Sequence, residues 1–185
     1  MRRYFLFFIS VAISQSVYSD MPERCKTWPT WLQAVCQRPY ETWTEGSLEL
    51  YVPGYAWHNR YKYDDEKIKT YNEWAWGGGL GKGFYDEKGD WHSLYAFVFL
   101  ESHGKVEPIA GYAFLKTLHL NDTTAAGLGF TVFLTARPDI LHNAPFPGIL
   151  PWASLTYRKL AFMGTYIPGS QNIGNVLFLL VKYTF

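Results

Sequence analysis

Three polar residues follow an apolar stretch in the middle of the chain. The segment AFVFLESHGK (96–105) becomes polar at Glu101, and the Ser102 hydroxyl and the His103 imidazole come next. Groups of these types carry out acyl transfer when a histidine removes the proton of a serine hydroxyl and a carboxylate orients the histidine. Neighbouring residues of a strand point to opposite faces, so Ser102 and His103 do not easily face each other. His58, which comes from another expected strand, is the better partner for Ser102.

Both positions also have a simpler interpretation. The ESH cluster is more typical of a solvated strand end, because connecting segments are usually exposed. His58 is equally typical of a histidine at a membrane interface. The remaining histidines, His92, His119 and His142, lie near expected turns or loops, and we interpret them as solvated. The pattern alone therefore leaves catalysis at Ser102 as one of two interpretations.

The composition narrows the class of protein. The chain has 185 residues, enough for one ordinary domain. Its formal net charge of +1 excludes a broad field that attracts nucleic acid. Aromatic residues make up 19% of the chain and include eight Trp, which is typical of strands and of belts at a membrane–water interface. Two cysteines without a suitable histidine nearby argue against a metal site, and no motif indicates a cofactor.

The first 19 residues predict a secretory signal peptide. Two arginines precede a short apolar core (4–13), and a small residue, Ser19, ends the segment. The alternative is a buried first strand. If the segment is a signal peptide, the mature chain begins near Asp20. No later stretch reaches the roughly 20 apolar residues that a spanning helix needs, so we expect export without a helical anchor.

Residues 20–46 are expected to form an amphipathic helix and its lead-in. Within 27–37, one apolar face recurs at the helical spacing i, i+3, i+4 and i+7. Its members are Trp28, Trp31, Leu32 and Val35. Two Trp on this face favour a helix at a membrane interface, and the alternative is a helix packed on a soluble core.

Cys25 and Cys36 would meet an oxidising compartment after export. On one continuous helix, the eleven-residue separation places their Cα atoms about 16 Å apart. A disulfide needs a Cα–Cα distance of about 7 Å or less. A break at Pro29 would let Cys25 fold back. The sequence therefore leaves the disulfide open.

The segments after the helix change to a period of two. Strand-like segments are expected at about 47–60, 74–85, 91–101, 107–117, 126–137, 149–157, 160–167 and 174–185. One face is large and apolar, as at Leu128 and Phe130, and the other is small, as at Gly127 and Gly129. The pattern predicts an all-β fold, an eight-stranded antiparallel transmembrane β-barrel over 47–185 that turns its apolar face to lipid and closes on itself.

Small residues on the second face suggest an interior that holds something other than side chains. Glycines alternate along WGGGLGKGF (76–84), which is typical of a strand face cleared of bulk. The run does not match a phosphate loop, because Lys82 is followed by Gly83 rather than by Ser or Thr.

Connection lengths indicate which way the strands run. Outer-membrane barrels have short periplasmic turns and longer outer loops. The turns DEKGD (86–90) and YRKL (157–160) are short, whereas the loops after the first and fifth segments are long. Odd-numbered segments therefore run outward, and the connection 118–125 fits this rule least well. This orientation predicts that His58 and Ser102 meet at the outer rim.

Short segments spread over nearly all of the expected mature chain carry a family resemblance. They are LYVPGYAWHNRYKYD (50–64), YNEWAWGGG (71–79), YDEKGDWHSLYAF (85–97), EPIAGY (107–112), GLGFTV (127–132), LPWAS (150–154) and TYIPG (165–169), with the terminal Phe185. Together they resemble the bacterial outer-membrane lipid A palmitoyltransferases, the PagP family. The resemblance implies an eight-stranded barrel with an amphipathic helix on the periplasmic side. It also implies transfer of an acyl chain, usually palmitate, from a phospholipid to lipid A in the outer leaflet.

The resemblance assigns roles to individual positions. His58 and Ser102 match the family's catalytic His and Ser, and Glu101 stands where the family has Asp. Lys67 matches a lysine linked to lipid A recognition, and a cation suits the lipid A phosphates. Ala113 replaces the glycine at the floor of the family's acyl pocket, so we expect a donor preference shifted below palmitate.

A lateral entry for lipid is also implied. Pro151 and Pro168 match prolines that interrupt hydrogen bonding between strands six and seven, because proline lacks a ladder donor. Gln171 stands where the family has a tyrosine implicated in gating, and Ala75 stands where it has a proline.

Three functions remain in competition. The first is an outer-membrane acyltransferase with a glycerophospholipid donor and a lipid A acceptor. The second is a phospholipase that passes the acyl chain to water at the same site. The third is a non-enzymatic small barrel that serves as an anchor or binds lipid. We expect a monomer or homodimer, and no nucleic-acid partner.

Overall fold

Antiparallel strands form a closed barrel in the computed structural model, which describes residues 21–137 and 141–185. The eight strands in these ranges are β1 (Ser47–His58), β2 (Gly77–Tyr85), β3 (Trp91–Leu100), β4 (Val106–Asn121), β5 (Thr124–Thr135), β6 (Phe146–Tyr157), β7 (Leu160–Ile167) and β8 (Val176–Thr184). Each strand pairs with the next, and β8 closes onto β1. The predicted eight-stranded barrel is confirmed, whereas the predicted signal peptide (1–19) lies outside the described residues.

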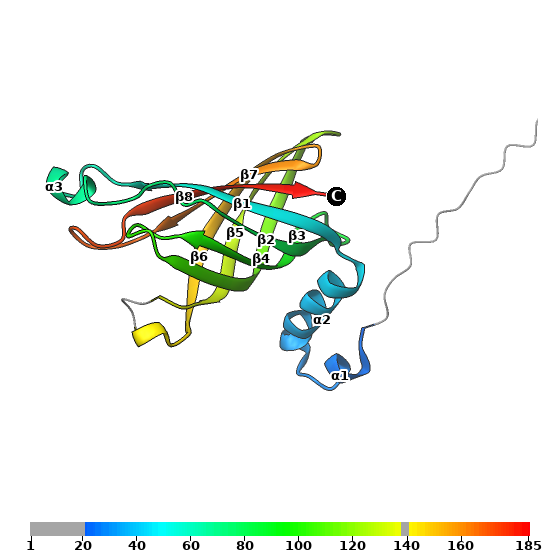
Figure 1. Cartoon of the computed structure of the whole chain (residues 1–185). Helices are drawn as coiled ribbons and strands as arrows, with labels where there is room; N and C mark the ends of the chain where they lie inside the picture. Colours follow the sequence, from blue (N-terminus) through cyan, green and yellow to red (C-terminus); the bar gives the residue numbers. More distant parts are fainter. Residues whose placement is uncertain (1–20, 138–140) are drawn as a thin grey trace, which may run out of the picture.

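Short helices lie before and between the strands (Figure 1). They are α1 (Glu23–Lys26), α2 (Thr30–Glu45), α3 (Asp65–Ile68) and the 3₁₀ turn η1 (Leu141–Asn143). The predicted helix over 27–37 begins later and runs further, with Pro39 inside it, until the backbone N–H of Gly46 bonds back to Thr42. Within the described part of the chain, no helix has the length and apolar character needed to cross a membrane.

Apolar side chains cover the outside of the barrel. In β5, Leu128 and Leu134 are exposed while Thr131 is buried, and in β8 Leu179 is exposed while Leu180 is buried. A soluble barrel would turn these apolar side chains inward, whereas a barrel in a membrane turns them toward lipid. The alternation therefore gives the surface that the sequence predicts for a transmembrane barrel.

The two ends of the barrel differ in their connections. Tight turns at 86–90, 122–123 and 158–159 lie at the end that also holds α2 and the C-terminus, and α3 and η1 lie at the other end (Figure 1). The expected connection 118–125 is mostly strand, because β4 continues to Asn121 and β5 begins at Thr124. This correction removes the misfit to the orientation rule, which predicts that the tight turns lie at the periplasmic end. We call this end the periplasmic end and the opposite end the outer end.

Cys25 and Cys36 form a disulfide, with a Cα–Cα distance of 5.6 Å. The helix breaks before Pro29, since α1 ends at Lys26 and α2 begins at Thr30. The break lets α1 fold back along α2. The disulfide that the sequence leaves open is therefore present.

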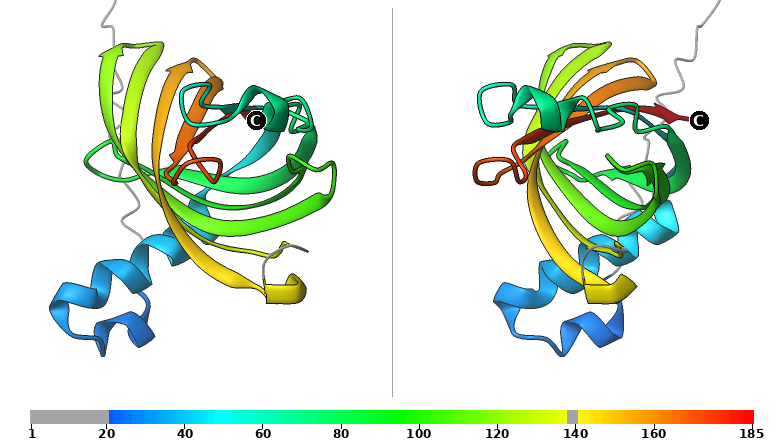
Figure 2. Two further views of the ribbon diagram at one scale, coloured as in Figure 1. Left: turned by 90° about the vertical axis from the view of Figure 1, so that its left-hand side faces the viewer. Right: turned by 60° about the vertical axis from the view of Figure 1, so that its left-hand side comes forward.

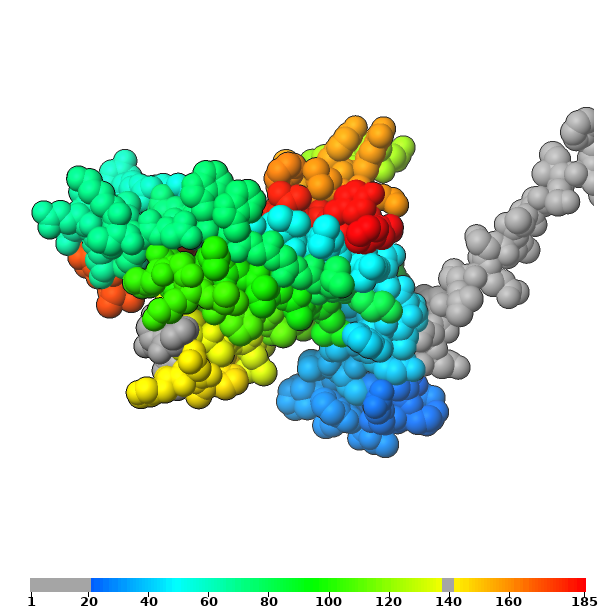
Figure 3. Space-filling model, viewed as in Figure 1, coloured from blue at the N-terminus to red at the C-terminus, as the bar shows by residue number. Residues whose placement is uncertain are grey.

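Arg38 fastens α2 to the turn between β2 and β3. Its guanidinium donates hydrogen bonds of 2.9 and 2.6 Å to Glu87 and one of 2.9 Å to Glu41. The bond from Arg38 is the largest cause that lowers the pKa of Glu87 to about 2. Trp31 and Trp43 remain exposed on α2, which projects with α1 from the barrel wall (Figure 3). Exposed aromatic residues fit a helix that lies at a membrane interface.

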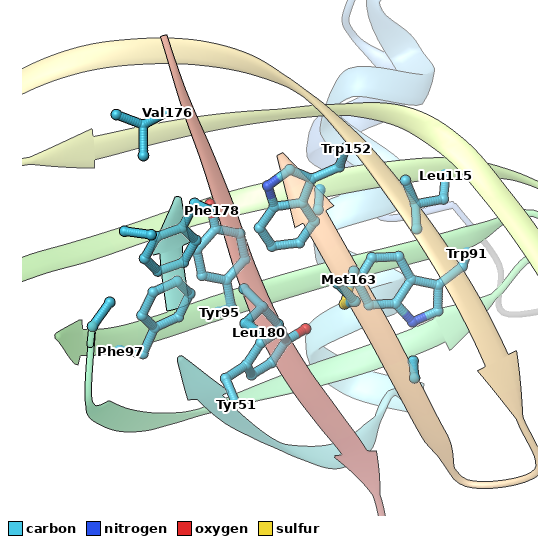
Figure 4. Close-up of a cluster of buried hydrophobic side chains, with 14 residues drawn as sticks. Tyr51, Trp91, Tyr95, Phe97, Leu115, Trp152, Met163, Val176, Phe178 and Leu180 are labelled. Atoms are coloured by element: carbon cyan, nitrogen blue, oxygen red, sulfur yellow. The ribbon is translucent and has the colours of Figure 1, made fainter. Parts of the chain in front are cut away.

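Buried hydrophobic side chains gather inside the barrel (Figure 4), and those of the periplasmic half, such as Trp91 and Met163, fill it. A Cβ added at Gly81 would collide with the Tyr51 ring, and one added at Gly83 would collide with the Glu49 carboxylate. The expectation that the glycine face leaves room for something other than side chains is wrong in this half. Large side chains from β1 occupy the space that the glycines clear.

A buried ion pair lies among these side chains. The Glu49 carboxylate binds the Lys182 ammonium, and both side chains are almost completely buried. Glu49 also accepts hydrogen bonds from Tyr51 at 2.8 Å and from Ser93 and Trp91 at 3.1 Å. Burying a carboxylate is costly unless it is paired and hydrogen-bonded, and Glu49 meets both conditions.

Strands β6 and β7 pair over part of β6. Their ladder ends at the pair Trp152–Thr165, although β6 itself begins at Phe146. Pro151 is the next residue toward the outer end, and Pro168 directly follows β7. The two ribbons run together at the periplasmic turn and separate toward the outer end (Figure 2). Pro151 therefore lies next to the last pair of the ladder, and Pro168 lies three residues beyond Thr165, at the end of β7.

Candidate active site

His58 and Ser102 come together at the outer end of the barrel. His58 is the last residue of β1 and is 1% exposed, and Ser102 lies in the turn after β3. The Nε2 atom of His58 lies 3.0 Å from the Oγ atom of Ser102. Because β1 and β3 both run toward this end, the structure brings together the two side chains that the sequence pairs, within reach for proton transfer.

A carboxylate contacts the other side of the His58 ring, and it belongs to Glu73. The Nδ1 atom of His58 lies 3.1 Å from Glu73 Oε1, and the backbone N–H of His58 donates to the same oxygen at 3.0 Å. Glu73 is not among the residues predicted from the sequence. The signal in the sequence is its place at the end of the long first loop, just before the run WAWGGG (74–79).

Glu73 is itself held by two further side chains. Arg60 donates two hydrogen bonds, of 2.7 and 2.6 Å, one to each carboxylate oxygen, and the Tyr55 hydroxyl donates at 2.7 Å. Burial alone would raise the pKa of Glu73. The bonds from Arg60, His58 and Tyr55 outweigh burial and lower this pKa to about 2. Glu73 is therefore a fixed anion beside His58.

Glu101 has a different position from the one that the sequence suggests. Its carboxylate accepts hydrogen bonds from the backbone N–H groups of His103, at 2.9 Å, and Lys105, at 3.1 Å, and lies 2.8 Å from His103 Nδ1. The expectation that Glu101 orients His58 is corrected, because Glu73 makes that contact. Glu101 instead shapes the turn that carries Ser102. The His103 ring contacts Glu101, whereas Ser102 contacts His58.

An apolar cavity opens beside this pair inside the outer half of the barrel. Its lining includes the polar residues Ser102, Glu101, Glu107 and Arg137. The apolar residues of its wall include Phe97, Phe99, Ile109, Leu150, Ile167, Val176 and Phe178. Tyr95, Thr131 and Trp152 lie at its inner end. The Tyr95 hydroxyl is 2.6 Å from Thr131 Oγ1, and the Tyr95 ring stacks on Trp152 with centroids 5.2 Å apart.

These inner-end residues separate the cavity from the filled half of the barrel. In Figure 4, Tyr95 and Trp152 lie between Val176 and Phe178 on one side and Trp91 on the other. Ala113 is fully buried, and in the ladder it pairs with Ser93 and Thr131. Thr131 contributes to the cavity wall, and Ala113 is its direct neighbour across the β4–β5 ladder.

The remaining predicted residues lie around the outer rim. Lys67 is in α3, and its ammonium donates a 2.8 Å hydrogen bond to the backbone carbonyl of Asn172, which joins the first loop to the last. Gln171 is exposed beside that carbonyl. Ala75 is buried, and its backbone N–H bonds to Gly54. The structure thus brings Lys67 and Gln171 near one another, and both are separate from the pair of His58 and Ser102.

One predicted solvated histidine is buried. His92 lies in β3, with Nδ1 2.5 Å from the Tyr112 hydroxyl and Nε2 3.2 Å from Asp86. The interpretation as solvated is wrong because α2 packs against this part of β3, and the Tyr112 hydroxyl and the Asp86 carboxylate satisfy the two ring nitrogens. His119 and His142 are exposed, as predicted.

Comparisons with known proteins identify the family. The sequence model of PagP, described as antimicrobial peptide resistance and lipid A acylation protein, matches residues 38–182. Over 169 residues the chain is 56% identical to the lipid A acyltransferase PagP of Legionella longbeachae, covering 90% of this chain and 73% of that protein. It is 56% identical over 158 residues to the protein of the same name from Legionella pneumophila, covering 85% and 84%. The corresponding protein of Bordetella parapertussis is 52% identical over 161 residues, covering 87% and 88%.

A comparison of folds adds a more distant likeness. The Yersinia pestis outer membrane protein Ail aligns with 76% of this chain and 99% of its own, at 12% identity and a TM-score of 0.41. That likeness is too low to bear on function. The match over 38–182 and the relatives above 50% identity are sufficient, and the chain belongs to the PagP family of outer-membrane barrels.

Proposed function

We propose that this chain transfers a fatty acyl chain from a glycerophospholipid to lipid A in the outer membrane. The observation that carries the proposal is the 3.0 Å contact between His58 Nε2 and Ser102 Oγ at the mouth of an apolar cavity. The cavity takes a hydrocarbon chain, and the pair supplies a nucleophile and a base. Family membership supports lipid A as the acyl acceptor, since the relatives are named lipid A acyltransferases.

The reaction proceeds by two acyl transfers, the first from the donor to Ser102 and the second from Ser102 to lipid A. In the first, Ser102 Oγ attacks the ester carbonyl of the donor while its proton passes to His58 Nε2. The bond to the glycerol oxygen then breaks, and His58 returns the proton to that oxygen, which releases a lysophospholipid. In the second, His58 takes the proton of a lipid A hydroxyl, the resulting oxygen attacks the acyl-serine, and Ser102 leaves with that proton.

The length of the donated chain depends on the inner end of the cavity. Tyr95 and Trp152 stop the chain there, and Thr131 holds the Tyr95 hydroxyl. Ala113 is the cross-strand neighbour of Thr131, so its methyl group takes up space beside that wall. The donor preference is therefore shifted below palmitate, because each misfitting methylene costs about 1–3 kcal/mol.

Lipid enters from the side of the barrel. The outer part of β6 extends beyond its ladder with β7, and Pro151 and Pro168 lack the N–H groups that would close it. Gln171 lies in the loop above this edge. Lys67 faces the lipid A phosphates, since an ammonium held at the outer rim suits an anionic headgroup.

The location follows from the same proposal. Residues 1–19 direct export and are removed, 20–46 form the interfacial helical segment, and 47–185 form the barrel. The exposed Trp31 and Trp43 keep that segment at the periplasmic surface. The barrel acts as a monomer or homodimer.

Labelled phosphatidylcholine tests the function directly. The folded protein is incubated with the labelled donor, with and without lipid A, and the products are separated by thin-layer chromatography. Label on lipid A supports the proposal. Free labelled fatty acid alone supports a phospholipase, and no product supports a non-enzymatic barrel. Ser102→Ala and His58→Ala should each abolish transfer, and full activity in both would overturn the mechanism.

A further inference from the structure

The segment Tyr71-Asn72-Glu73 contacts both members of the catalytic pair. The Glu73 carboxylate lies 3.1 Å from His58 Nδ1, and the backbone N–H of Asn72 donates a 2.7 Å hydrogen bond to the carbonyl of Ser102. The Tyr71 ring packs on the His58 ring, with centroids 4.7 Å apart. Three consecutive residues of one loop therefore touch two residues that come from different strands.

We propose that this segment positions the pair, and that Glu73, rather than Glu101, is the carboxylate that orients His58. The proposal rests on the function proposed above and adds a positioning residue to it. Glu73 touches the base and not the substrate, so it acts through His58.

The contact with Glu73 decides which nitrogen of His58 carries the proton. An ionised carboxylate is an acceptor only, so the ring must donate from Nδ1. A neutral imidazole has one N–H, and placing it on Nδ1 leaves a lone pair on Nε2. That lone pair faces Ser102 Oγ at 3.0 Å. His58 is therefore held in the form that accepts the serine proton.

The surroundings of Glu73 keep its carboxylate in place. Arg60 donates to both carboxylate oxygens of Glu73, and the Tyr55 hydroxyl donates to Oε2. The backbone N–H of His58 donates to Oε1 as well. When His58 takes the serine proton it becomes an imidazolium, and the adjacent Glu73 anion stabilises that charge without taking the proton. The carboxylate of Glu101 instead accepts hydrogen bonds from His103, Lys105 and Arg137.

Asn72 and Tyr71 complete the arrangement by joining two loops. The hydrogen bond from the Asn72 backbone fixes the turn that carries Ser102. The Tyr71 ring lies between the His58 and His103 rings, with centroid distances of 4.7 and 5.3 Å. A misplacement of about 1 Å between catalytic groups costs about 100-fold in rate. The short segment thus sets the distance between base and nucleophile.

The test compares Glu73→Gln with two matched controls, Glu101→Gln and Glu66→Gln, in the full chain. Glu66 is an exposed carboxylate of the same loop. Glu73→Gln should lower kcat about 100-fold or more with little change in KM for the phospholipid. Losing the anion also disfavours the imidazolium, so the acidic limb of the kcat/KM profile should move to lower pH. Glu66→Gln should change neither quantity, and Glu101→Gln should leave the pH profile in place.

A spectroscopic readout is independent of activity. Nitrogen-15 NMR of His58 in detergent micelles should show the Nδ1–H tautomer in the wild-type protein and in Glu101→Gln. An Nε2–H tautomer in the wild-type protein would overturn the proposal even if Glu73→Gln fails to fold. So would a folded Glu73→Gln protein with kcat within threefold of wild type. Wild-type protein that transfers no acyl chain would instead refute the proposed function, and the tautomer would still test Glu73.

Discussion

Replacing Lys182 tests whether the buried ion pair holds the barrel interior together. Lys182→Ala leaves Glu49 with its charge in a site where it is 1% exposed. Removing one partner of a buried pair typically costs about 3–5 kcal/mol. The Lys182 ammonium also lies 4.6 Å from the centroid of the Trp91 ring, a contact that adds to the loss. We therefore expect the upper part of this range.

The assay is urea unfolding of the refolded barrel in lipid vesicles, followed by tryptophan fluorescence and by electrophoretic mobility without heating. With a urea slope of about 1–3 kcal/mol/M, the midpoint should fall by at least about 1 M. The matched control is Lys26→Ala, since Lys26 forms a pair of 2.7 Å with Glu23 on the surface. An exposed pair contributes about 0–1 kcal/mol, so this variant should unfold close to wild type.

A double variant separates pairing from packing. Lys182→Met with Glu49→Gln removes both charges and keeps side chains of similar length, so it should recover most of the stability that Lys182→Ala loses. A Lys182→Ala protein that loses less than about 1 kcal/mol would refute the reasoning. That result would mean that water or another group compensates the charge of Glu49.

Further predictions concern the cavity, the lateral opening and the loop carboxylates. Ala113→Gly should move the donor preference toward longer chains, and unchanged acyl lengths on lipid A by mass spectrometry would count against the role of this methyl group. Pro151→Ala supplies a ladder donor at the edge of β6 and should slow turnover without lowering the urea midpoint, which rapid-mixing kinetics can measure. The folded-state pKa of Glu73 is about 2, against 4.5 as its ordinary value. Because this pKa is lowered, the stabilising effect of Glu73 is fully present above about pH 4.5 and is lost as the pH falls toward 2. An acid unfolding transition above pH 4.5 that disappears in Glu73→Gln would contradict this assignment.

The fold could be predicted largely from side-chain alternation. Leu128 and Phe130 on one face against Gly127 and Gly129 on the other are sufficient for a lipid-facing barrel, because the period of two is a local property of a strand. The disulfide between Cys25 and Cys36 could not be predicted from such a local pattern. Whether the cysteines meet depends on how sharply the chain turns before Pro29, which spacing alone does not determine.

The candidate site was predicted in part, and the reason is again physical. His58 and Ser102 lie at the ends of strands that run in one direction, so strand direction places them at the same end of the barrel. Glu73 belongs to a loop, and its approach to His58 depends on Arg60 and Tyr55, whose contacts no sequence period encodes. Glu101 is predicted from its adjacency to Ser102 and from the Asp that the family has at this position, although adjacent residues of a strand point apart.

The glycine face shows the same limit. Alternating glycines correctly indicated a strand face without bulk, but not what fills the space in front of it. Tyr51 and Glu49 fill it in the periplasmic half, and the cavity remains in the outer half. Interior packing depends on which side chains face each other across the barrel, and that pairing is fixed by closure and register.

The central claim is that His58 and Ser102 move an acyl chain onto lipid A. The most direct measurement is transfer of labelled acyl chain from phosphatidylcholine to lipid A by folded wild-type protein, Ser102→Ala and His58→Ala, with folding of each checked by mobility without heating. The account predicts labelled lipid A with the wild-type protein and none with either folded variant. Transfer at the wild-type rate in both variants, or free fatty acid as the sole labelled product of the wild-type protein, would contradict it.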